Sequence, residues 1–107
     1  MYGIVGRWTA VGRQATFDVT PLRKVRSGEF ADLVIQSDGS GYAEKKRLIG
    51  KAEITSLSWH YETGGYLISI PSTNMVLIAT LSDGLLLTVW KSSIKSIDGM
   101  AVLYERV

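Results

Sequence analysis

Short runs of apolar and β-branched residues alternate along the chain with turns that contain glycine and aspartate. Turn signals such as Asp38-Gly39 and Asp83-Gly84 recur at the ~8–12-residue spacing typical of an all-β sandwich or barrel. No window carries apolar residues at i, i+3, i+4 and i+7 over three helical turns, so no long helix is expected. The strands that this pattern predicts span residues 6–11, 15–20, 30–36, 42–47, 51–62, 66–70, 75–81, 85–91 and 100–107.

This rhythm predicts an all-β fold, an antiparallel meander β-barrel of about eight short strands. Residues 1–107 are expected to form one such domain, because a chain of this length suits a single core. We expect at most one or two helical turns, with residues 92–98 as the main candidate. The basic stretch 22–29 is interpreted as a loop.

A glycine-rich segment, Asp38-Gly39-Ser40-Gly41, separates two predicted strands. Glycine loops that bind phosphate lead into a helix whose amide groups point at the anion, and no helical pattern follows Gly41. Asp-Gly between alternating residues favours a hairpin, because both central positions tolerate positive φ. The segment is therefore predicted to reverse the chain rather than to bind phosphate.

The long predicted strand 51–62 cannot keep all its apolar side chains on one face. They are divided between the even positions Ala52 and Ile54 and the odd positions Leu57, Trp59 and Tyr61. Because side chains alternate across a strand, both sets can point inward only if the strand is irregular. We expect a bulge or bend near Thr55-Ser56, of the kind that curves strands around a barrel.

Composition and charge narrow the functional classes. The chain has no cysteine, which excludes a disulfide framework, a thiolate metal site and a cysteine nucleophile. Its net charge of +2 is too small to indicate a nucleic-acid partner without a basic patch. No apolar run approaches the ~20 residues of a membrane-spanning helix. No signal peptide is visible, so a cytoplasmic location is the default expectation.

Candidate catalytic chemistry is sparse. His60 is the only histidine, so no histidine-based metal cluster is expected, and its alternation with Trp59 points it outward. The ten carboxylates are scattered, and no pair is marked as a general acid with its partner. We therefore expect no catalytic site, no metal and no cofactor, and rank an enzyme below a binding protein.

Two basic clusters deserve notice: Arg23, Lys24 and Arg26, and Lys45, Lys46, Arg47 and Lys51. If they met on one face they would form an anion patch, to which Tyr42 and Tyr66 could add stacking surfaces for bases. Interspersed Glu44 and Glu53 favour instead an ordinary solvated strand face.

The residues Gly6-Arg7-Trp8 are similar to the G-x-W that opens lipocalins and related calycins. The stretches VIQSDGSGYAEK and LSWHYETGGYLISI resemble lipocalin-like small domains in their order of apolar strand, Asp-Gly turn, Trp-bearing strand and glycine-rich turn. The resemblance implies a basic residue in the last strand that packs across the first-strand tryptophan, and Arg106 and Trp8 match these roles. A guanidinium over an indole gains a cation–π contact and would tie the first strand to the last.

The resemblance favours a non-enzymatic binding module for a small apolar or amphipathic ligand. Eight short strands leave an interior just wide enough to fill with side chains or to hold one small ligand. Taking the tryptophan-bearing face of each strand as inward, the expected ligand-binding set is Leu57, Trp59, Tyr61, Ile68, Leu77 and Trp90.

The alternative is a protein-interaction module, such as an inhibitor or immunity-type partner, with a filled barrel and no small ligand. The predicted strands 66–70 and 75–81 are apolar on both faces. Coverage of both faces would indicate a protein partner or a homodimer.

Overall fold

The computed structural model describes residues 3–14, 23–26, 28–47 and 49–107. Within these ranges the chain forms strands and one short 3₁₀ helix, η1 (Pro71–Thr73). The strands are β1 (Gly6–Gln14), β2 (Arg23–Lys24), β3 (Asp32–Ile35), β4 (Ser40–Lys45), β5 (Glu53–Glu62), β6 (Gly65–Ile70), β7 (Met75–Ser82), β8 (Leu85–Lys91) and β9 (Ala101–Arg106).

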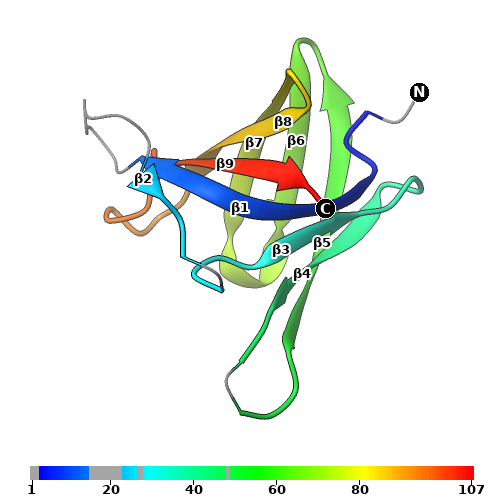
Figure 1. The fold of residues 1–107 in the computed structure, drawn as a ribbon. Coiled ribbons are helices and arrows are strands. Elements are labelled where there is room, and N and C mark those ends of the chain that lie inside the picture. Colours follow the sequence, from blue (N-terminus) through cyan, green and yellow to red (C-terminus); the bar gives the residue numbers. More distant parts are fainter. Residues whose placement is uncertain (1–2, 15–22, 27, 48) are drawn as a thin grey trace.

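The strands form one antiparallel meander that closes on itself (Figure 1). Each strand from β3 to β9 pairs with its successor in sequence, β1 pairs with β3, and β9 returns to pair with β1. Eight strands therefore enclose the barrel, while β2 adds to β1 only at Gly12 and Arg13. The prediction of an all-β, eight-stranded antiparallel barrel is confirmed.

Strand β1 is shared between two neighbours on one side. Its first residues pair with β3 and its last residues with β2, while β9 runs along its other edge. The register with β9 shifts between Ala10 and Gly12, which marks a bulge. Such an extra residue bends the strand, so β1 can leave β3 for β2 while it stays bonded to β9.

A bulge or bend was expected near Thr55-Ser56 of β5, and the bulge is wrong. Residues 53–58 pair with β4 and residues 58–62 with β6, without a shift in register. The first half of β5 leaves the barrel with the end of β4 as a projecting arm (Figure 1). Ile54, 54% exposed, therefore has no interior to face, and the conflict between the two faces of this strand does not arise.

The structure can be compared with three further local predictions, for residues 92–98, 22–29 and 15–20. The turn at residues 92–98 is one helical turn without an assigned helix, in which the amides of Ile97 and Asp98 donate to the Ile94 carbonyl at 3.1 and 3.0 Å. Residues 22–29, interpreted as a basic loop, contain β2. This short strand pairs with Gly12 and Arg13 of β1, and the Val25 amide donates to the Val11 carbonyl. The strand predicted at 15–20 lies outside the described residues.

The Asp38-Gly39 segment is the hairpin between β3 and β4, as predicted. The Ser40 hydroxyl and amide donate to Asp38 Oδ1 at 2.5 and 3.0 Å. These bonds, the hydroxyl's first, hold the pKa of Asp38 below its ordinary value. Gly39 has a φ of 90°, which a turn of this kind requires.

Side chains fill most of the barrel. Alternate residues of each strand point inward. The largest fully buried apolar side chains are those of Ile4, which precedes β1, and of the strand residues Trp8, Tyr104, Leu33, Ile35, Ile68, Leu77, Leu86 and Val102. Thr88 is a buried polar residue whose hydroxyl donates to the Val102 carbonyl at 3.0 Å and accepts from Trp90 Nε1 at 3.0 Å. No helix in the described part of the chain is long and apolar enough to span a membrane.

Candidate functional site: an apolar hollow at the barrel mouth

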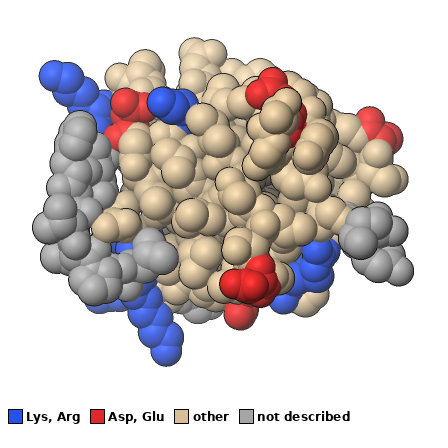
Figure 2. Space-filling model, turned by 90° about the horizontal axis from the view of Figure 1, so that it is seen from above, with Lys and Arg blue, Asp and Glu red and all other residues tan. Residues whose placement is uncertain are grey.

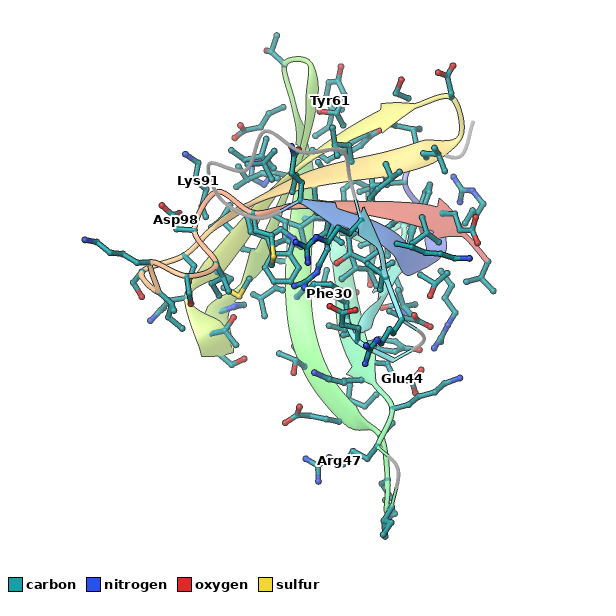
Figure 3. The ribbon with its side chains drawn as sticks, turned by 60° about the vertical axis from the view of Figure 1, so that its left-hand side comes forward. Phe30, Glu44, Arg47, Tyr61, Lys91 and Asp98 are labelled. Atoms are coloured by element: carbon teal, nitrogen blue, oxygen red, sulfur yellow. The ribbon has the colours of Figure 1, made fainter. Side chains whose placement is uncertain are left out.

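The two ends of the barrel differ in construction. We call the mouth the end that carries the β4–β5, β6–β7 and β8–β9 connections. The closed end carries the β3–β4, β5–β6 and β7–β8 turns and both ends of the described chain. Figure 3 shows the separation: Tyr61 lies toward the closed end, and Arg47 lies on the arm at the mouth.

Trp8 and Arg106 close one end. Trp8 is fully buried, and its Nε1 donates to the Ile4 carbonyl at 2.8 Å. The Arg106 Cζ lies 4.4 Å from the centroid of the Trp8 ring, and the guanidinium donates to the carbonyls of Val5 and Gly3 at 2.6 and 2.9 Å. One side chain of the last strand thus holds the segment that leads into the first strand.

The aromatic residues expected to line a pocket from β5 lie at this closed end instead. Trp59 is half-buried, and its Nε1 donates to the Gln36 carbonyl at 2.8 Å. Tyr66 packs edge-to-face against both Trp59 and Tyr61, with centroid distances of 5.8 and 5.3 Å.

Tyr61 does not line the interior: it is 66% exposed. Its position on the inward-facing side of β5 was inferred correctly from alternation, but β5 continues past the rim of the barrel, where that side meets water. Leu57 and Ile68 are buried in the filled middle of the barrel, and Leu57 Cδ1 lies 2.8 Å from where a Cβ on Gly41 would stand.

The mouth contains a hollow of about 130 Å³ with an almost wholly apolar wall. Two members of the expected set, Leu77 and Trp90, line it; Leu57, Trp59, Tyr61 and Ile68 do not. The sequence reasoning missed the small residues Ala31, Ala43 and Thr55 that leave the space, and the large residue Tyr104 that bounds it.

Trp90 is held in place on two sides. Its Nε1 donates to the buried Thr88 hydroxyl, and Phe30 meets its ring edge-on, at a centroid distance of 5.4 Å and an interplanar angle of 81°. Phe30 comes from the segment before β3 and lies near the middle of the view in Figure 3. Two contacts therefore fix the position of the Trp90 ring in the wall of the hollow.

Tyr104 is the only titratable residue that lines the hollow. It is 1% exposed, and burial, with a smaller effect of the Asp32 charge, raises its pKa above the ordinary tyrosine value. Its hydroxyl makes no hydrogen bond to a described residue, and since no buried side-chain polar atom of the described residues lacks a partner, this hydroxyl is not sealed from water. The neutral phenol has one donor and an acceptor. The alternation that places Arg106 over Trp8 also points Tyr104 inward, so a sequence signal for it existed.

Two larger hollows, of about 420 and 560 Å³, lie on the outer wall and are mainly polar. One is bordered by Lys46 and Arg47, the other by Arg23, Lys24 and Arg26, and both include Gly28. The two basic clusters noted in the sequence therefore flank one region of the mouth. Tyr66 lies at the closed end, so the stacking set considered for bases is not assembled.

Arg7 forms ion pairs with two carboxylates that border one of these polar hollows. Its guanidinium bonds to Glu44 and, at 3.0 Å, to Asp32. The hydrogen bond with Glu44 is the largest cause that raises the Arg7 pKa.

His60 is exposed, as its alternation with Trp59 predicts, and bonds to Glu62 at 2.8 Å. Among the described residues no group of histidine and carboxylate side chains is arranged to hold a metal ion.

No protein-family model matches the chain, and no curated protein and no solved structure matches it significantly. The fold is that of a small, closed, eight-stranded antiparallel β-barrel with an apolar hollow at one end.

Proposed function

We propose that the protein is a non-enzymatic binding module of lipocalin-like type, which holds a small amphipathic molecule in the hollow at its mouth. The observation that carries this proposal is Tyr104, a buried tyrosine in the wall of an otherwise apolar hollow, whose hydroxyl bonds to no described residue and is not sealed from water. Water on such a hydroxyl can be exchanged for the hydrogen-bonding group of a ligand. A ligand with an apolar body and one hydrogen-bonding group fits this combination.

The size of the hollow limits the ligand. A dry apolar cavity of roughly 150 Å³ accommodates a benzene molecule, and this hollow measures about 130 Å³. The inserted part is therefore about one ring or a short alkyl chain, and any larger part extends through the mouth. The absence of acid–base pairs among the lining residues favours binding over catalysis.

The test is calorimetric titration with 1-naphthol and with naphthalene, which share an apolar body and differ by one hydroxyl. The wild-type protein is expected to bind both, and 1-naphthol more tightly. Tyr104→Phe removes the hydroxyl partner and should weaken 1-naphthol by about tenfold, the effect of one hydrogen bond, while naphthalene binding is unchanged.

Two further variants separate the hollow from the rest of the barrel. Ala43→Leu places extra methyl groups in the hollow and should abolish binding of both probes, with folding checked by circular dichroism. Trp59→Phe, at the closed end, is the matched control and should bind as wild type. No binding by wild-type protein, or full binding by folded Ala43→Leu, would contradict the proposal.

A second candidate function, a protein-interaction module, is favoured by the outer surface of β6 to β9. Paired residues of these strands carry apolar side chains outward: Leu67, Ile78, Leu87, Val89 and Leu103. Figure 2 shows that on the face seen from above the charged residues lie mainly around the margin. Outward apolar side chains on neighbouring strands are typical of association sites.

Sedimentation velocity over a range of concentrations tests the homodimer form of this second candidate. A concentration-dependent dimer that Ile78→Lys converts to a monomer would support it. A monomer at all concentrations would leave the small-ligand function as the better explanation.

A further inference from the structure

The charged residues divide unequally between the two ends of the barrel. Around the mouth, the described residues include ten lysines and arginines against five carboxylates, a surplus of five positive charges. The rest of the described chain has two arginines, Arg7 and Arg106, against four carboxylates. The modest net charge of +2 therefore conceals a strong polarity along the molecule.

The lysines carry most of this surplus. All six lysines of the chain, Lys24, Lys45, Lys46, Lys51, Lys91 and Lys95, belong to strands or connections at the mouth. None of them forms an ion pair with a described residue, whereas Arg13 pairs with Glu29 and Arg47 with Glu53. Their charges are thus available to an external partner.

Two isoleucines are exposed in the same connections. Ile49, in the β4–β5 arm, is 90% exposed, and Ile94, in the β8–β9 connection, is 57% exposed. The arm extends well beyond the barrel (Figure 1). The antiparallel strand order puts the second connection, on which Figure 3 labels Lys91 and Asp98, at the same end of the barrel. Each isoleucine has basic residues close by in sequence: Arg47 and Lys51 near one, Lys91 and Lys95 near the other.

We propose that the mouth of the barrel docks on an anionic lipid surface. Ile49 and Ile94 would enter the boundary between headgroups and acyl chains, and the lysines would remain at headgroup level. Apolar side chains with basic neighbours are the combination that binds peripheral proteins to anionic bilayers. Each basic residue near such a surface adds about a fivefold gain in binding.

A nucleic acid is the competing anionic partner, and the residues exposed at the mouth favour the lipid. Single-stranded nucleic acids are bound by a basic groove together with aromatic stacking platforms. The projecting residues at the mouth are isoleucines, while exposed Tyr61 lies toward the opposite end. Isoleucine tips contribute to insertion in lipid and contribute little to base stacking.

Docking in this orientation would bring the apolar hollow to the membrane surface. An amphipathic ligand could then pass between bilayer and barrel without crossing water. The docking proposal itself rests on the charges and exposed isoleucines, so it can succeed or fail independently of ligand binding in the hollow.

Vesicle flotation tests the proposal with the complete protein. We expect binding to phosphatidylcholine vesicles that contain about one third phosphatidylglycerol, and little binding to pure phosphatidylcholine. Raising the salt from about 0.1 M to about 1 M should weaken binding strongly, because exposed charges are screened.

Matched variants test the contributions of the basic charges and of the exposed isoleucines to vesicle binding. Lys45→Gln with Lys46→Gln should reduce binding by more than tenfold. Thr63→Glu with Ser82→Glu, which changes the net charge equally at the closed end, should have a much smaller effect. Ile49→Ser should reduce binding by about tenfold, and Val107→Ser, at an exposed apolar residue of the closed end, should leave it unchanged.

The orientation of the protein on the vesicle can be measured with a dye attached to a single introduced cysteine, because the chain contains no cysteine of its own. An environment-sensitive dye on Ser93→Cys, beside Ile94, should shift to the blue on vesicles, and the same dye on Thr63→Cys should not. Equal shifts at both sites, or equal loss in both charge variants, would overturn the proposal. It would also be overturned if a single-stranded oligonucleotide displaced the protein from vesicles and its own binding were unaffected by Ile49→Ser.

Discussion

Arg106 and Trp8 lie in different strands at opposite ends of the chain, yet the guanidinium carbon of one stands 4.4 Å from the ring centroid of the other. The backbone register places the same two residues opposite each other in the β1–β9 pair. This contact joins the first strand to the last where the barrel closes, and it makes the stability of the fold testable by single substitutions.

Trp8→Ala should lower the free energy of unfolding by about 3–5 kcal/mol, because it removes a fully buried indole and leaves a cavity. Arg106→Ala should cost about 1–2 kcal/mol, from the lost cation–π contact and the lost bonds to the Val5 and Gly3 carbonyls. Urea denaturation measures both. Arg23→Ala, an exposed residue, is the control and should change stability by less than about 0.5 kcal/mol. A loss below about 1 kcal/mol for Trp8→Ala would contradict this account.

Gly6→Ala tests why glycine precedes the Arg7-Trp8 pair. Gly6 has a φ of 138°, and a Cβ there would lie 2.6 Å from Arg106 Nη1. We expect a loss of about 1–3 kcal/mol from backbone strain and collision together. In the Arg106→Ala background the collision disappears, so the cost of Gly6→Ala should become smaller. Equal costs in both backgrounds, measured by urea denaturation, would show that only the backbone matters.

The Asp38-Ser40 turn should make stability depend on pH. The folded-state pKa of Asp38 is below its ordinary value of 3.8, mainly because the Ser40 hydroxyl donates to it. The stabilisation is therefore fully present above that ordinary value and is lost as the pH falls through the folded pKa. Ser40→Ala should be less stable than wild type at neutral pH, and the difference should shrink in acid. A difference that stays constant across this range would rule out the charge on Asp38 as its source.

Removing the hydroxyl group of Thr88 and that of Tyr104, two buried residues, should affect the free energy of unfolding differently. Thr88→Val breaks the bond to the Val102 carbonyl and leaves Trp90 Nε1 without its acceptor, which should cost about 1–3 kcal/mol. Tyr104→Phe removes a hydroxyl that bonds to none of the described residues, so the unliganded protein should be unchanged or slightly more stable. Thermal unfolding of both variants checks this; a large loss for Tyr104→Phe would reveal a protein partner for its hydroxyl.

Local signals along the chain identified most strands because they depend on neighbours in sequence. The predicted strand 85–91 matches β8, and 66–70 differs from β6 by one residue, since Asp-Gly and Gly-Gly turns bound both. Strand β2 was missed for the opposite reason. Its two residues carry no strand pattern, and they are a strand only because β1 offers them partners.

Alternation alone determined which side chains point inward, and the register observed for Leu57, Ile68, Leu77 and Trp90 agrees with it. Alternation does not tell how far along the barrel axis a residue lies. Tyr61 is past the rim, Leu57 is in the filled centre, and only Leu77 and Trp90 reach the hollow. The hollow exists because small residues from separate strands, Ala31, Ala43 and Thr55, meet at one level. An empty space of this kind is a relation between distant segments, so only the tertiary structure decided it, as it decided that every lysine gathers at the mouth.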